Sequence, residues 1–152
     1  MKPRFHDHDP FPQVAGEAAD LCERLQADLE FRAGAVILHV YGEADAYTGH
    51  RWQRILDTAL TRATGRLVVD LSGTQFIGCR PILDLAERAQ HGLSRGVQVV
   101  VFNPFPSVME RVVAIAGLNA WLPVYTTLAE ALAVPAPSAT PAEPVVPVPG
   151  AR

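Results

Sequence analysis

The sequence predicts a single α/β domain with a mostly parallel sheet of four to five strands and about four helices. Three apolar runs, bounded by turn residues and rich in β-branched side chains, are typical of buried strands. They span residues 36–41, 67–71 and 97–102. Between them, apolar residues recur at helical spacing. Strands that alternate with helices in this way favour α/β layers around a mostly parallel sheet.

An N-terminal arm is predicted over residues 1–26, ahead of a domain over residues 27–133. Residues 1–16 are polar and contain three prolines, so we expect this part of the arm to be loose. Apolar residues then recur at helical spacing over residues 18–29. This stretch could form a short helix or run into a first strand near Asp28–Arg32.

The central elements follow from local patterns. A turn at Ala33-Gly34 introduces the strand Val36–Tyr41. Thr48 is a candidate N-cap for an amphipathic helix whose apolar stripe is Trp52, Ile55, Leu56, Ala59 and Leu60. The strand Leu67–Leu71 ends before Ser72 and Gly73. Pro81 suits the first turn of the next helix, and the residue before a proline avoids the α region. We therefore expect Arg80 to be the last non-helical residue and the helix to continue to Leu93.

The last elements are a helix, a short strand and another helix. Ser107 and Glu110 have the spacing of a capping box, and Gly117 is a natural place for that helix to end. A strand is expected at Pro123–Tyr125, and Thr127 with Glu130 predicts the start of a final helix. Residues 134–152 turn to Pro, Ala and Val with almost no charge, which predicts a disordered tail.

Composition excludes several classes of function. A net charge of -3 at pH 7 argues against direct nucleic-acid binding, which needs a basic surface. No apolar run reaches the length needed to insert into a membrane, and the N-terminus lacks the apolar core of a signal peptide. The two cysteines, Cys22 and Cys79, fit neither a disulfide framework nor a metal box. We expect a cytoplasmic protein without a metal or cofactor, and with no catalytic constellation, so not an enzyme.

An ordered set of motifs covers the chain from about Asp28 to Ala133. Val69-Asp70-Leu71-Ser72 is followed after a short gap by Phe76-Ile77, and Gly42-Glu43 with Asp45 stands upstream. Gly117-Leu118 and residues 122–125 stand downstream. This set resembles the STAS family of bacterial anti-sigma-factor antagonists and their relatives, whose pattern is V-D-L-S, a gap, then F-I-D-S-[ST]-G-L.

The resemblance implies a function that is switched by phosphorylation, and this chain departs from the family pattern at the phosphorylated position. In the family, the serine after the acid lies at a helix start, and its phosphorylation releases an anti-sigma factor that is itself kinase-like. Here Gly78 stands for the acid, Cys79 for the serine, Arg80 for the next residue and Pro81 for the glycine. A thiol does not accept phosphate from such a kinase, so the usual switch should be absent. Thr74 is the one nearby residue that we consider as a substitute phosphate acceptor.

The resemblance places the partner surface around the loop that follows the predicted strand Leu67–Leu71. Its expected residues are Asp45, Gly78, Cys79, Arg80, Pro81 and Asp84. Asp45 could instead cap the following helix. Asp84 is charged and is expected on the helix face that the apolar stripe leaves free.

Cys79 has two interpretations. A thiol at a helix N-terminus beside an arginine favours the reactive thiolate form and could act as a redox sensor. The alternative, which we prefer, is a small apolar residue packed beneath the loop. The whole domain also has two alternative functions. It could bind a nucleotide or other small ligand through Arg80 and the helix N-terminus, or it could be a subunit of a sensory or transport assembly.

Overall fold

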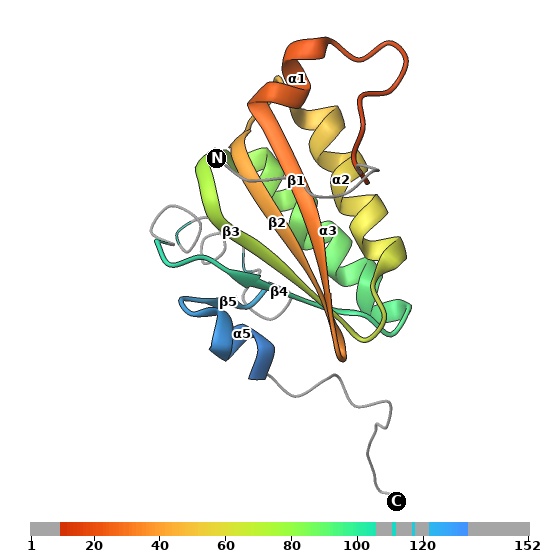
Figure 1. The fold of residues 1–152 in the computed structure, drawn as a ribbon. Helices are drawn as coiled ribbons and strands as arrows, with labels where there is room; N and C mark the ends of the chain where they lie inside the picture. Colours follow the sequence, from red (N-terminus) through yellow and green to blue (C-terminus); the bar gives the residue numbers. More distant parts are fainter. Residues whose placement is uncertain (1–9, 106–110, 112–116, 118–121, 134–152) are drawn as a thin grey trace, which may run out of the picture.

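The computed structural model describes residues 10–105, 111, 117 and 122–133. Its elements, labelled as in Figure 1, are α1 (Ala19–Arg24), β1 (Leu25–Arg32), β2 (Ala35–Ala44), α2 (Gly49–Arg62), β3 (Arg66–Ile77), α3 (Cys79–Ser94), β4 (Gln98–Phe102), β5 (Val124–Tyr125) and α5 (Leu128–Ala133). The helix expected from Ser107 to Gly117 falls mainly outside the described residues, as do Trp121, residues 1–9 and the tail over 134–152.

The five strands form one mixed sheet in the order β1-β2-β3-β4-β5. β1 and β2 form an antiparallel hairpin around Gly34, whose φ of 79° favours glycine. β2, β3, β4 and β5 pair in parallel. The α/β fold class with a mostly parallel sheet is therefore confirmed, and the hairpin supplies the single antiparallel pairing among the described strands.

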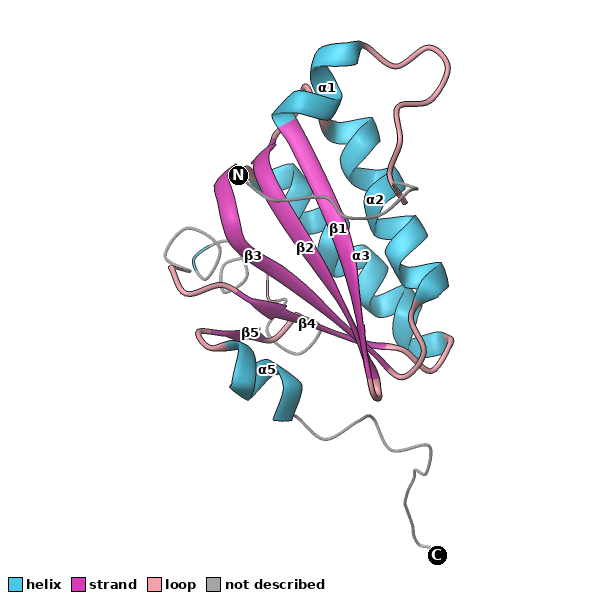
Figure 2. Cartoon of the chain, in the orientation of Figure 1, coloured by secondary structure: helices cyan, strands magenta, loops and turns pink. Residues whose placement is uncertain are grey.

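Two helices cover one face of the sheet, and the short α5 packs on the other (Figure 2). The larger core lies beneath α2 and α3 and contains every residue of the apolar stripe predicted for α2. The smaller core joins Ile37, Val68 and Val100 to Ala131 of α5. This helix begins as predicted, with the backbone N–H of Glu130 donating to Thr127 Oγ1 at 3.1 Å.

A charged cluster lies on the α5 side of the sheet, across three neighbouring strands. His39 Nδ1 lies 2.6 Å from Asp70 Oδ2, and His39 Nε2 lies 2.8 Å from Glu30 Oε1. Asp70 also accepts the Ser72 backbone N–H at 2.8 Å. The hydrogen bond that His39 donates to Asp70 raises the pKa of His39, although partial burial acts against it. Asp70 therefore has a structural role, holding β2 to β3 through its bond with His39.

The N-terminal segment is packed where a loose arm was expected. Phe11 is 1% exposed and belongs to the larger core. Farther along, the carboxylate of Glu17 lies between Arg51 and Arg54 of α2. The expectation of a loose arm is wrong at Phe11, because burial of its aromatic ring outweighs the polar composition around it. Residues 12–16 are exposed.

Helix and strand boundaries differ from prediction at two places. The helical spacing over residues 18–29 yields only the six-residue α1, because from Leu25 the chain pairs with β2. β3 extends six residues beyond the predicted Leu71, to Ile77, and pairs with the end of β2 through two register shifts. Strand pairing thus overrides local spacing in both places. No helix in the described part of the chain is long and apolar enough to cross a membrane.

Candidate functional site

The candidate site is built on the β3–α3 junction, residues 76–80. Gly78 is the N-cap of α3 in an extended conformation, with φ −85° and ψ 176°. Its backbone N–H donates to the Ala44 carbonyl at 2.9 Å, and its own carbonyl accepts the Ile82 N–H at 3.3 Å. The junction is therefore fastened to the end of β2 on one side and starts α3 on the other.

The helix begins earlier than predicted. α3 starts at Cys79, so Arg80 is helical and Pro81 is the third helical residue. A proline is tolerated throughout the first turn because those N–H groups have no intrahelical acceptor. The indole N–H of Trp52 donates to the Pro81 carbonyl at 2.9 Å. This bond from α2 holds the first turn in place.

Cys79 is exposed, which contradicts the expectation of a small residue packed beneath the loop. Pro81 and Ile82 fill the buried positions of the first turn, so residue 79 is left on the outer side. Cys22 is partly buried, its Sγ lies 3.7 Å from Glu17 Oε1, and both cysteines are free thiols. The junction therefore presents a thiol to solvent at the position where the family pattern has serine.

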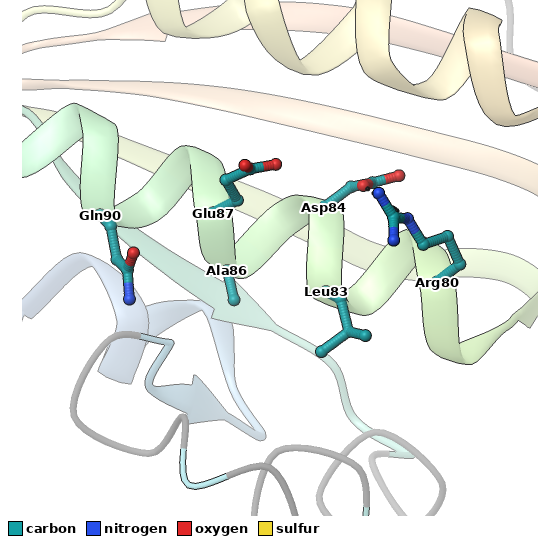
Figure 3. Close-up of a pocket in the computed structure, with 6 residues that line it drawn as sticks. All are labelled: Arg80, Leu83, Asp84, Ala86, Glu87 and Gln90. Atoms are coloured by element: carbon teal, nitrogen blue, oxygen red, sulfur yellow. Dashed lines mark ion pairs between the residues drawn. The ribbon is translucent and has the colours of Figure 1, made fainter.

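Asp84 does not lie on a free face of α3, contrary to prediction. Its side chain is 3% exposed and lies 3.2 Å from Arg80 Nε (Figure 3). Gln53 of α2 donates to its second oxygen at 3.4 Å. The apolar stripe identifies the face toward the sheet, but the neighbouring helix α2 covers a second face that the stripe does not reveal. Arg80, whose side chain is 74% exposed, is the accessible member of this pair.

The β2–α2 turn, residues 45–48, lies beside the junction and is held by reciprocal bonds. Asp45 Oδ1 accepts the Thr48 N–H at 3.0 Å, and Thr48 Oγ1 accepts the Asp45 N–H at 2.9 Å. Thr48 occupies the predicted N-cap position, but its hydroxyl donates to the Glu43 carbonyl instead of capping the helix. Burial alone would raise the pKa of Asp45, yet hydrogen bonds from Thr48 and Arg24 lower it. Asp45 is thus an ionised, partly exposed group.

Two exposed aromatic residues near the site were not singled out from the sequence. Tyr47, in the β2–α2 turn, is 54% exposed, and Phe76, at the junction, is 53% exposed. The alternation between Phe76 and the buried Ile77 was a usable signal, since neighbouring residues in a strand face opposite sides. Tyr47 carried no such signal. Exposed aromatic rings are enriched where proteins bind other proteins.

Thr74, the substitute acceptor that we considered, lies within β3 and not at the helix start. Its hydroxyl donates to the Leu71 carbonyl at 2.6 Å, and the residue is partly buried. The helix N-terminus at the junction therefore carries the thiol of Cys79 in place of a hydroxyl.

Comparison with known proteins identifies the family. The family model for the STAS domain matches residues 26–131. The anti-sigma-F factor antagonist RsfA of Mycobacterium tuberculosis is 36% identical over 124 residues, which are 80% of this chain and 96% of that protein.

Two solved structures are similar. A crystal structure of an anti-sigma factor antagonist from Mycobacterium paratuberculosis matches with a TM-score of 0.59 and 28% identity, covering 71% of this chain and 91% of that one. The phosphorylated Bacillus cell fate determinant SpoIIAA matches with a TM-score of 0.53 and 20% identity, covering 70% and 96%, and supports the fold. Together with the family match, these findings show that the chain belongs to the STAS domain family.

Proposed function

We propose that this protein is an anti-sigma factor antagonist that binds an anti-sigma factor and thereby frees a sigma factor. The observation that carries the proposal is the 36% identity to RsfA over nearly the whole of that protein, whose name gives this function. We propose a kinase-like anti-sigma factor as the partner, the cytoplasm as the place of action, and binding without catalysis as the activity.

The proposed contact surface consists of the β3–α3 junction and the β2–α2 turn. It offers the exposed Cys79 and Arg80, the aromatic rings of Phe76 and Tyr47, and the ionised Asp45. Aromatic and arginine side chains supply most of the binding free energy in typical protein interfaces. Gly78 and Pro81 position these groups through the backbone bonds at the start of α3.

We further propose that binding is not switched by phosphorylation at the junction. Residue 79 is a cysteine, and the hydroxyl of Thr74 is bonded within β3. The protein would then act whenever it is present, with its abundance as the control.

A calorimetric titration tests the proposal. The purified chain is titrated with each anti-sigma factor of its own organism, and Cys79→Asp is compared with the wild type. Cys79→Asp puts a negative charge on the exposed first turn, as a phosphate would. We expect it to weaken binding by at least about 10-fold, since groups at the centre of an interface contribute about 2 kcal/mol or more.

Gln90→Glu is the matched control, because it adds the same charge to an exposed position of α3 about three turns away. Its affinity should equal that of the wild type. Absence of binding by the wild type to every anti-sigma factor would overturn the proposed function. Equal losses in both variants would show that the junction is not the contact surface.

A further inference from the structure

A polar hollow of about 350 Å³ lies next to the junction, and its lining includes Gly42 and Glu43 of the upstream motif. Its walls come from four elements: α1, the start of β1, the end of β2 and the β3 extension. The side chains that line it include those of Glu23, Arg24, Gln26, Tyr41, Glu43 and Gln75. Figure 1 shows α1 at the edge of the sheet where β2 and β3 end.

The hollow is continuous with the proposed contact surface. Glu43 pairs in register with Phe76 of the junction, and Gly42 pairs with Thr74. The next residue of β2, Ala44, accepts the Gly78 N–H. A protein that covers the junction would therefore also reach the mouth of the hollow.

The charge around the hollow is mainly negative. Two carboxylates, those of Glu23 and Glu43, line it, and a third, that of Asp45, pairs with the lining residue Arg24. The one guanidinium, Arg24, is already engaged, with Nη2 lying 3.1 Å from Glu43 Oε1 and 3.3 Å from Asp45 Oδ2. Arg24 also lies over the ring of Tyr47, 5.1 Å from its centre. Glu23 is exposed and forms no ion pair with any residue that the structure describes.

We propose that this hollow receives an arginine side chain of the protein partner, an inference that rests on the proposed function. A guanidinium matches the free carboxylate of Glu23 and can bond the side-chain oxygens of Gln26 and Gln75 through its several N–H donors. Arginine fits this combination better than lysine, whose ammonium is a compact point charge.

This site would help to select the partner. Glu23 and Arg24 precede residue 26, where the family match begins. α1 thus adds a wall to the site from outside the region that the family model matches. An anti-sigma factor that carries an arginine at the matching position would bind more tightly than one that lacks it. The difference in affinity would come from the ion pair between this arginine and Glu23.

The first test measures affinity for the anti-sigma factor found in the titration above. Glu23→Gln removes one charge and leaves both ion pairs of Arg24 in place. We expect binding to weaken by about 3- to 10-fold, as for a partly exposed interfacial ion pair, and to depend less on salt. Glu130→Gln, at an exposed position of α5, is the matched control and should bind like the wild type.

The outcomes separate the two proposals. If Cys79→Asp weakens binding and Glu23→Gln does not, the antagonist function stands and the arginine site is wrong. If both variants weaken binding and both controls do not, the junction and the hollow belong to one interface.

A second test does not need the anti-sigma factor. The wild-type chain is titrated with N-acetyl-arginine amide and, separately, with the neutral isostere N-acetyl-citrulline amide, and backbone amide NMR shifts are followed. We expect saturable shifts around Glu23, Gln26 and Gln75 with the arginine compound only, and smaller shifts in Glu23→Gln. Equal responses to the two compounds, or none, would overturn the arginine site even if no anti-sigma factor binds.

Discussion

At the scale of single residues, the proposed lack of a phosphorylation switch rests on position 79. A serine at the start of α3 could take phosphate at the positive end of the helix, and the chain has an exposed cysteine there. The backbone at Gly78 also accepts the aspartate of the family pattern. A Cβ built at Gly78 would meet Phe76 and Pro81 at ordinary distances of 3.5–3.7 Å, and its φ of −85° suits any residue.

The double variant Gly78→Asp/Cys79→Ser should therefore fold and regain a phosphoacceptor. Aspartate is also a favourable N-cap residue. After incubation with a kinase-like anti-sigma factor and ATP, we expect mass spectrometry to find about one phosphate per chain, on residue 79. Gly78→Asp alone, which lacks the hydroxyl, should stay unmodified. Phosphate on the junction or on Thr74 of the wild type would contradict the proposed lack of a switch.

His39 makes stability depend on pH. The hydrogen bond to Asp70 raises the pKa of His39. The contribution of protonated His39 to the free energy of unfolding is therefore complete below about pH 6.5, and it is lost as the pH rises through the raised pKa. His39, with Arg32, lowers the pKa of Glu30. For Asp70, burial alone would raise the pKa, but bonds from His39 and Ser72 lower it. These carboxylate contributions are present above about pH 4.3 and are lost as the pH falls through the lowered values.

His39→Gln should reduce the free energy of unfolding by about 1 kcal/mol near pH 6, because charged hydrogen bonds are stronger than neutral ones. The difference should shrink toward zero at pH 9. Urea denaturation over this pH range measures both effects, with His50→Gln, at an exposed position, as the control. A difference between wild type and variant that does not change with pH would show that His39 does not titrate in its bonds to Asp70 and Glu30.

At the scale of elements, α2 holds the start of α3, and with it the proposed contact surface, in place. Trp52 is fully buried in the larger core, and its indole N–H reaches the first turn of α3. Gln53, the next residue, bonds Asp84 one turn farther along. The apolar side chains of α2 therefore pack in the larger core, while hydrogen bonds from Trp52 and Gln53 hold the start of α3.

Trp52→Phe tests this link. The substitution removes the bond to Pro81 and leaves a small cavity, and each costs about 1 kcal/mol, so the free energy of unfolding should fall by about 2 kcal/mol. Hydrogen exchange of Ile82, at the start of α3, should quicken more than that of Val100 in β4. A loss below about 0.5 kcal/mol would mean that the indole bond does not hold the helix start.

At the scale of the whole molecule, the domain is larger than the family region. Residues 10–25 lie ahead of the family match over residues 26–131, yet they contribute Phe11 to the core and Glu17 to a charged contact with α2. They also supply α1, which borders the proposed arginine site. One segment thus contributes to the core and also borders the proposed site.

Phe11→Ala should lower the free energy of unfolding by about 3 kcal/mol, because it removes a fully buried aromatic ring. Val14→Ala, at an exposed position of the same segment, should change it by less than about 0.5 kcal/mol. Chemical denaturation of the full chain measures both. Equal, small effects would show that residues 10–18 do not form part of the cooperative core.

Most of the architecture could be predicted because it depends on local periodicity. The apolar runs that became β2, β3 and β4 and the stripe of α2 repeat over a few residues, so each is visible in its own segment. The same holds for Thr127, which bonds the Glu130 N–H as its spacing predicted. The motifs also fall at the β3–α3 junction and the β2–α2 turn, where the proposed contact surface lies.

The sequence by itself thus determined the fold class, the family and the thiol at position 79, all of which are properties of residue order. Only the tertiary structure decided that Asp84 is buried, that Cys79 is exposed and that Phe11 joins the core. Cys79 is left on the outer side because Pro81 and Ile82 take the buried positions of the first turn of α3. Asp84 and Phe11 are buried by elements distant in sequence, and a local pattern describes one face of a helix, not its neighbours. The hollow beside Glu23 arose in the same way, where four separate elements meet.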